Sequence, residues 1–171
     1  ERIMYDIKRS ALTTSTYNIK NQQTALDRIE LNSLFHILLP GPKMIWQFEE
    51  RGYDISINDF GGRLGEKPPY WHYLNNTNRT DIFKVIAKLN HLKQTNEVFS
   101  SRNFEYNLTG ETKWFSFTSE ENNVVAIGNF GITENTVSVT FNKTGKYFEF
   151  FTNDSIEINA LEKNVTLAPG E

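Results

Sequence analysis

The pattern of apolar and polar positions changes its period once along the chain, shortly after Val98. Before that point, apolar residues recur every three or four positions, a spacing typical of amphipathic helices. After it, apolar residues alternate with polar ones, which is typical of half-buried β-strands. The chain is therefore expected to consist of helices and loops first, and of an all-β module second.

Residues 24–39 are predicted to form a helix, because their apolar side chains share one face. Asn21 or Thr24 is placed to cap its N-terminus. The Pro-Gly-Pro run at residues 40–42 must end the helix, since proline cannot donate a backbone hydrogen bond inside it. The apolar face consists of Leu26, Ile29, Leu34, Ile37 and Leu38.

A second helix is predicted over residues 78–95, with Asn78 as its N-cap and Asp81 three positions later as in a capping box. Its apolar face is continuous, and its lysines lie off that face. Residues 1–20 contain only one short apolar cluster, so we expect a loop with one turn of helix there. The apolar face of the second helix consists of Ile82, Val85, Ile86, Leu89 and Leu92.

The segment between these helices has two parts. Residues 43–48 are apolar on both faces, which predicts a short parallel strand covered on both sides. Residues 49–76 are rich in glycine and proline and read as one long loop, a length typical of functional or disordered segments. Its aromatic residues favour an ordered loop; they are Tyr53, Phe60, Tyr70, Trp71 and Tyr73.

Residues 101–171 are predicted to form a β-sandwich of seven short antiparallel strands spaced about ten residues apart. Residues 1–100 form the preceding helix–strand–loop–helix domain, with the boundary between residues 97 and 102. The alternating apolar positions that predict the strands include Phe104, Tyr106, Phe115, Phe117, Val124, Ala126, Val137, Val139, Phe148, Phe150, Ile156, Ile158, Val165 and Leu167.

Composition excludes several classes of function. The 171 residues carry a net charge of −3 without a basic stripe, so nucleic acid is not an expected partner. No apolar run approaches the length of a membrane span. The chain has no cysteine, its three histidines are scattered, and no EF-hand pattern is present, so neither a disulfide nor a metal site is expected. No nucleotide-binding loop is present, and no cofactor is expected.

The order of elements and several motifs resemble the C-terminal end of the α-amylase family, glycoside hydrolase family 13, most closely its Bacteroidetes-like branch. In that family a (β/α)8 barrel ends with its eighth strand and helix, and a β-sandwich called domain C follows. One departure is Glu49, where relatives usually carry glycine. The matching segments are ERIMY (1–5), TALDRIEL (24–31), PGPKMIWQF (40–48), GYD (52–54), SIN (56–58), KP (67–68) and WHY (71–73).

The resemblance implies that this chain ends an α-glucan-active enzyme but carries none of its catalytic residues. Retaining hydrolysis uses two carboxyl groups about 5 Å apart, which in this family lie on strands four and five. A third, at strand seven, would precede Glu1. The resemblance also implies sugar contacts for Glu50, at the end of the predicted strand, and for Tyr53 and Asp54. For each of these, a purely structural role in the loop is an open alternative.

Two function hypotheses remain open on the sequence alone. The first is a fragment of a starch- or glycogen-active enzyme, itself inactive, whose residues 1–100 form an open α/β fragment packed on the sandwich or on another copy of the chain. The second is a non-catalytic module that binds α-glucan or a partner. The sequence leaves hydrolase, branching and transferase activities open for the parent, and leaves its location open between cytoplasm, periplasm and cell surface.

Overall fold

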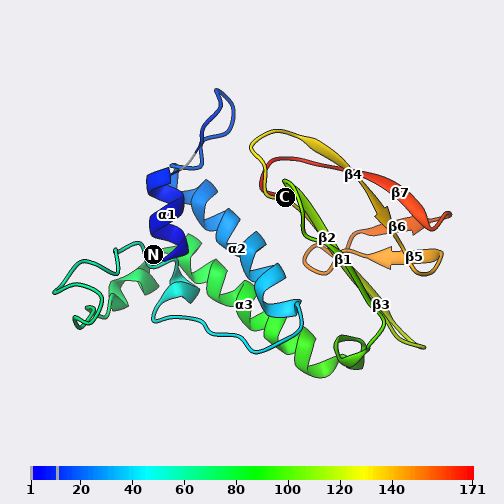
Figure 1. The fold of residues 1–171 in the computed structure, drawn as a ribbon, viewed down its shortest axis with the longest axis horizontal. Coiled ribbons are helices and arrows are strands. Elements are labelled where there is room, and N and C mark those ends of the chain that lie inside the picture. Colours follow the sequence, from blue (N-terminus) through cyan, green and yellow to red (C-terminus); the bar gives the residue numbers. More distant parts are fainter. Residues whose placement is uncertain (1, 11) are drawn as a thin grey trace. The chain divides into compact units, whose positions relative to one another are not determined.

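The computed structural model describes residues 2–10 and 12–171 (Figure 1). They divide into two compact units, which we call the helical unit, up to Thr95, and the β unit, from Asn96 to Pro169. Of the motif at residues 1–5, Glu1 lies outside the described residues. Within the described part, no helix has the length and apolar character needed to cross a membrane.

Two long helices form the framework of the helical unit, and they lie side by side in Figure 1. Their apolar faces meet in a core that contains Leu26, Ile82 and Leu89, all fully buried. Burial of these faces stabilises both helices, since most of the stability of a helix in a protein comes from the packing of its apolar face. The helices are α1 (Ile3–Ser10), α2 (Gln22–Leu38) and α3 (Thr77–Thr95), with the short 3-10 helices η1 (Glu49–Arg51) and η2 (Trp71–Asn75).

The predicted long helices are confirmed, with small changes at their ends. Asn21 caps α2 as expected, its side-chain oxygen accepting hydrogen bonds from the backbone N–H groups of the first turn. The cap of α3 is Asn76, not Asn78, because the Asn76 side-chain oxygen accepts a hydrogen bond from the Arg79 backbone N–H at 3.2 Å. The N-terminal segment forms an eight-residue helix, α1, where the sequence predicted a single turn.

The predicted strand at residues 43–48 is not formed. The segment carries no ladder hydrogen bonds, and its apolar side chains are open to solvent, with Met44 69%, Ile45 41% and Trp46 48% exposed. A strand requires a neighbouring strand to satisfy its backbone groups. None of the strands among the described residues pairs with this segment, which explains why the apolar pattern failed as a predictor here.

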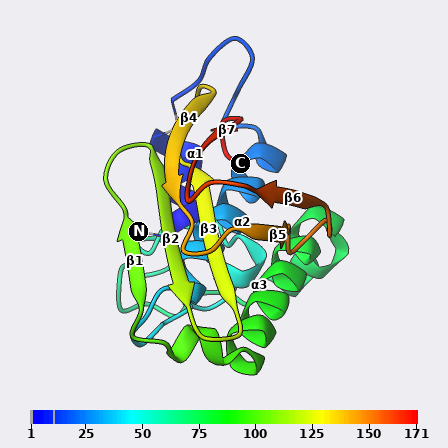
Figure 2. The same ribbon diagram turned by 90° about the vertical axis from the view of Figure 1, so that its right-hand side faces the viewer.

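The β unit contains the seven short strands that the alternating pattern predicted, and every pairing is antiparallel. They form three small sheets, ordered β1-β2-β3, β4-β7 and β5-β6. Figure 2 shows the longer strands of the first sheet running beside one another. The strands are β1 (Phe104–Asn107), β2 (Thr112–Thr118), β3 (Asn123–Asn129), β4 (Asn135–Thr140), β5 (Gly145–Phe148), β6 (Ser155–Ile158) and β7 (Glu162–Leu167), preceded by the 3-10 helix η3 (Glu97–Ser100).

Part of the predicted aromatic core of the β unit is instead exposed. Phe115 and Phe117 on β2 are buried as expected. By contrast, Tyr106 on the edge strand β1 and Phe148 on β5 are about as exposed as ordinary surface residues, at 59% and 61%. These strands each pair with a single neighbour, so one backbone edge and much of each face lack protein cover.

Candidate functional site

The most densely connected polar cluster of the helical unit centres on Asp54, at the start of the long loop. Lys8 of α1 donates to its carboxylate at 2.8 Å, and Arg79 of α3 does so at 3.1 Å. The Tyr73 hydroxyl of η2 donates to the other carboxylate oxygen. One carboxylate therefore joins α1, the loop, η2 and α3.

Arg79 is the buried partner in this cluster, with 5% of its surface exposed. It also donates to the backbone carbonyls of Arg51, at 2.8 Å, and of Gly52. Its guanidinium lies 3.8 Å from the centre of the Tyr73 ring. Because these partners surround the guanidinium, Arg79 fixes the path of the backbone that follows η1.

Gly52 is required at this turn for two reasons. Its φ of +62° lies in the left-handed region, which side chains rarely adopt. A Cβ atom there would also lie 2.6 Å from Cδ2 of Leu26 in the helical core. The loop thus packs its backbone directly onto α2.

Tyr53 is completely buried and serves as the second anchor of the loop. Its hydroxyl donates to the carbonyl of Pro68 at 2.8 Å, which joins the two ends of the loop. The guanidinium of Arg2 lies 4.0 Å from the centre of its ring. Cation–π contacts of this kind are strongest where water is excluded. The neighbouring rings are those of Phe48, Tyr70 and Tyr73.

The electrostatics of the cluster keep Asp54 ionised. Burial alone would raise its pKa, but the hydrogen bonds from Lys8 and Tyr73 and the charge of Arg79 hold the pKa below its usual range. Burial and the adjacent carboxylate raise the pKa of Tyr73, so this phenol stays protonated. Asp54 is thus a fixed anion among cations, an arrangement that suits positioning rather than proton transfer.

Glu50 differs from the two other residues predicted to contact sugar. Within the described part of the chain, no hydrogen bond or ion pair engages its carboxylate, which lies partly exposed on η1. Tyr53 is therefore buried and Asp54 mostly so, at 13% side-chain exposure, and both are bonded to groups of the helical unit, whereas Glu50 is left open. Sugar contact by Glu50, Tyr53 and Asp54 stays a prediction.

Sequence reasoning missed the cations of this cluster. Lys8 is separated from Asp54 by 46 positions and carries no local signal. Arg79 did carry one, because it lies in phase with the apolar face of α3, three residues before Ile82 and seven before Ile86. A charged residue in such a position is buried with that face and requires a partner.

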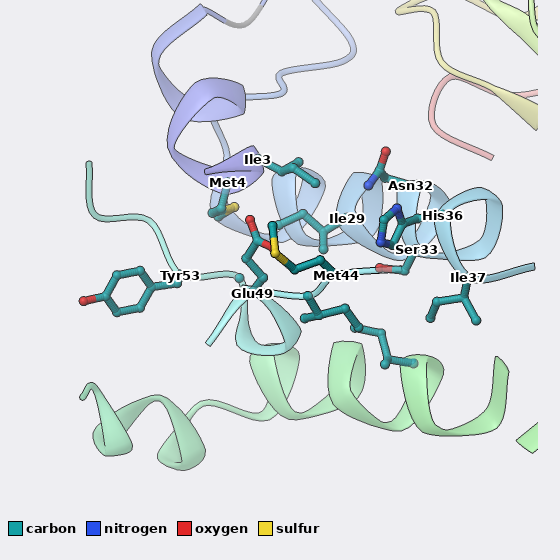
Figure 3. Close-up of a pocket in the computed structure, with 13 residues that line it drawn as sticks. Ile3, Met4, Ile29, Asn32, Ser33, His36, Ile37, Met44, Glu49 and Tyr53 are labelled. Atoms are coloured by element: carbon teal, nitrogen blue, oxygen red, sulfur yellow. The ribbon is translucent and has the colours of Figure 1, made fainter. Parts of the chain in front are cut away.

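A pocket of about 100 Å³ lies beside the cluster, between α1, α2 and the segment that enters the loop. Figure 3 shows Met44 and Glu49 of that segment facing Ile29 and His36 of α2 across it. The lining is mainly apolar. Among residues 2–10 and 12–171, no group of three or more metal-ligating side chains gathers here or elsewhere.

Glu30 on α2 makes the stability of the helical unit dependent on pH. Burial, together with the charges of Asp27 and Asp81, raises the pKa of Glu30 to about 7. Since the folded-state pKa lies above the unfolded one, the folded state binds more protons, and stability falls as pH rises from about 4 to about 7. Discounting for partial exposure, the ionised form costs about 1–2 kcal/mol.

We therefore expect Glu30→Gln to raise the free energy of unfolding by about 1–2 kcal/mol above pH 7, with little effect at about pH 4. Urea denaturation at several pH values measures this difference. Glu66→Gln, at an exposed position in the same unit, serves as the matched control and should leave the pH profile unchanged. An equal gain at both pH extremes would contradict this account of Glu30.

Comparison with known proteins places this fold among α-amylase family enzymes. No protein-family model and no curated protein matches the chain. A structure of AmyP in complex with maltose has a TM-score of 0.68 and 13% identity, covering 86% of this chain and 34% of that one. An Anoxybacillus α-amylase has a TM-score of 0.62 and 16% identity, covering 85% and 31%. A cyclomaltodextrinase has the same score and identity, covering 84% and 24%.

A variant of AmyP in complex with maltotriose matches 99% of this chain, with a TM-score of 0.71. The chain spans 37% of the length of that protein. The match includes both units, and it agrees with the antiparallel sheets found at the C-terminal ends of these enzymes. At 13% identity the similarity establishes the fold and leaves the activity to be argued from the residues.

Proposed function

We propose that this chain is the C-terminal part of an α-glucan-active enzyme of the α-amylase family, and that the catalytic carboxylates lie outside residues 1–171. Residues 1–100 contribute the last strand–helix unit of the (β/α)8 barrel, and residues 101–171 contribute the C-terminal β domain. Solved structures with this fold carry maltose and maltotriose, which supports an α-glucan as substrate. The Bacteroidetes-like branch stays a prediction.

The exposed segment Met44–Trp46 is the observation that carries this proposal. It is apolar on both faces, yet none of the described strands pairs with its backbone, and its side chains are 41–69% exposed. Contiguous exposed apolar surface of this kind marks an interaction site. In an α/β barrel, flanking strands and the barrel core supply that cover. In the isolated chain, a second copy of the chain could cover the segment Met44–Trp46 instead.

We assign different roles to the three residues expected to contact sugar. Tyr53 and Asp54 hold the loop in place, since both are bonded to groups within the helical unit. Glu50 remains the candidate for a sugar hydroxyl, because its carboxylate is unengaged among the described residues. We assign to none of the three a place in the pair of catalytic carboxyl groups that glycoside hydrolysis needs.

Incubation of the chain with soluble starch and maltooligosaccharides tests its predicted inactivity. We expect no release of reducing ends above that of the buffer, because no acid–nucleophile pair is assigned to its residues. Release of reducing ends that persists through repeated purification would contradict the proposal, since it would place the catalytic carboxyls within residues 1–171.

A second candidate function, non-catalytic binding of α-glucan, is favoured by Trp71. Its indole is 65% exposed, although its ring meets that of Phe48 edge-on at a centroid distance of 5.0 Å. A large aromatic face held by a packed neighbour and open to solvent suits stacking on a pyranose ring. This candidate requires no chemistry from the chain.

Affinity electrophoresis in a starch-containing gel separates the two candidates. If Trp71 is a binding platform, the chain is retarded and Trp71→Ala removes about 1–2 kcal/mol of binding, a loss on the order of tenfold. Tyr106→Ala, at an exposed aromatic of the β unit, serves as the control and should retain full retardation. A mobility unaffected by starch would contradict the binding candidate and leave the enzyme proposal unchanged.

A further inference from the structure

The loop that follows the Asp54 cluster closes around the ammonium group of Lys67. Its Nζ atom donates to the backbone carbonyls of Asp59 at 2.8 Å, Gly62 at 2.6 Å and Gly65 at 3.0 Å. We call these three oxygens the carbonyl cage. No ion pair engages Lys67 within the described part of the chain, and its three hydrogen-bond acceptors are all neutral carbonyl oxygens.

The backbone of this loop is shaped so that the three carbonyls converge. Phe60, Gly61 and Gly62 all have positive φ, of 54°, 87° and 79°. Gly65 passes so close to the preceding turn that an added Cβ would lie 1.9 Å from the Phe60 carbonyl oxygen. Convergent carbonyl dipoles repel one another, and a conformation of this kind persists only where its surroundings hold it. The Lys67 ammonium supplies the opposing charge.

We propose that the carbonyl cage is a monovalent-cation site that the chain fills with its own ammonium group, and that this internal cation holds the loop in shape. The donor set supports a monovalent ion, because neutral carbonyl oxygens replace the hydration shell of ions such as K⁺. Calcium and magnesium sites usually include carboxylate ligands, and none contributes to the cage. The inference concerns this loop alone and does not rest on the proposed enzymatic function.

The internal cation has a structural consequence for the surrounding surface. The backbone carbonyl of Lys67 accepts a hydrogen bond from the Gln47 side chain at 3.3 Å, and the next carbonyl, of Pro68, accepts from Tyr53. The backbone that follows the cage is thus bonded to Gln47, next to the exposed segment Met44–Trp46, and to the buried Tyr53. The same loop carries two exposed apolar side chains, Phe60 at 52% exposure and Leu64 fully exposed. The internal cation would hold them in a fixed position.

Limited trypsin digestion of the protein tests the proposal, because Arg63 provides an exposed cleavage site inside the loop. Trypsin does not cleave between Lys67 and Pro68, so replacing Lys67 neither adds nor removes a site there. We expect Lys67→Met, which keeps the bulk of the stem and removes the charge, to increase cleavage after Arg63 on the order of tenfold or more. Cleavage after Arg102, in the β unit, gives an internal reference, and Lys84→Ala removes an exposed lysine as the control.

Chemical rescue tests the cation site itself. Lys67→Ala leaves the cage empty, so ammonium or K⁺ should restore protection of Arg63, whereas tetramethylammonium at the same ionic strength should not, because it cannot donate to or coordinate the carbonyls. In Lys67→Met the stem blocks the cage, and neither ion should protect. Wild-type cleavage rates in both variants would show that the Lys67 ammonium does not hold the loop in shape. Loss of protection in Lys67→Ala without rescue by either ion would overturn the cation site. If Lys67→Ala does not fold, Lys67→Met still tests whether the ammonium group holds the loop in shape.

Discussion

Replacing Asp54 with asparagine is expected to lower the free energy of unfolding of the helical unit by about 3–5 kcal/mol. The substitution keeps the shape of the side chain but leaves the guanidinium of Arg79, whose side chain is 6% exposed, without its anion. An uncompensated buried charge dominates the loss. The contact with Lys8, whose side chain is 42% exposed, contributes little because solvent screens it.

Denaturant unfolding followed by far-ultraviolet circular dichroism measures this loss, since the helices lie in this unit. Asp81→Asn is the matched control, because it removes an exposed ion pair with Lys84 on α3. At about pH 5.5, where Glu30 is protonated and is not repelled by Asp81, it should change stability by less than about 0.5 kcal/mol. Equal losses in the two variants would contradict the role of Asp54. Because the folded pKa of Asp54 is lowered, its contribution is present above the unfolded value, near 4, and is lost as pH falls through the folded value.

Replacing Asn129 with alanine is expected to destabilise the β unit by about 2–4 kcal/mol. This fully buried side chain at the end of β3 donates to the carbonyls of Thr133 at 2.8 Å and of Leu167 and Ala168, both at 3.1 Å. Its own oxygen accepts from the Gly131 backbone N–H at 2.9 Å. The side chain therefore joins two separate sheets. Its removal leaves several buried carbonyl and N–H groups without their hydrogen-bond partner.

Hydrogen exchange measured by mass spectrometry reports this loss within the β unit, as faster exchange of the amides in β3 and β7. Asn164→Ala, at an exposed position on β7, removes an amide of the same kind without breaking a buried network, and should leave exchange nearly unchanged. Unaltered protection of both strands in Asn129→Ala would show that the network does not stabilise the unit.

The elements that the sequence predicted well are those specified by local periodicity. The apolar faces of α2 and α3 and the alternation from Phe104 onward each repeat over enough residues to identify a period. The Asp54 cluster could not be predicted from the sequence, because Arg79 and Lys8 lie 25 and 46 positions from Asp54. No local pattern relates residues so far apart. Only the phase of Arg79 within an apolar helix face pointed to a buried charge.

The failure at residues 43–48 is the most informative difference between sequence and structure. The apolar residues on both faces of this segment predict a buried strand. In the structure, however, Met44, Ile45 and Trp46 are largely exposed. A strand pattern describes the surroundings that a segment requires, and its neighbours must be present for the strand to form. The mismatch is what our account expects of a barrel strand without its flanking strands.

We propose that the chain works as part of a longer α-amylase family enzyme. The most direct test is the mass of the native polypeptide that contains this sequence, by denaturing electrophoresis of the source cells with an antibody raised against residues 98–171. We expect a species several times larger than the 19.8 kDa of these residues. A species near 19.8 kDa would contradict it, because the chain would then stand alone without the carboxyl pair that hydrolysis requires.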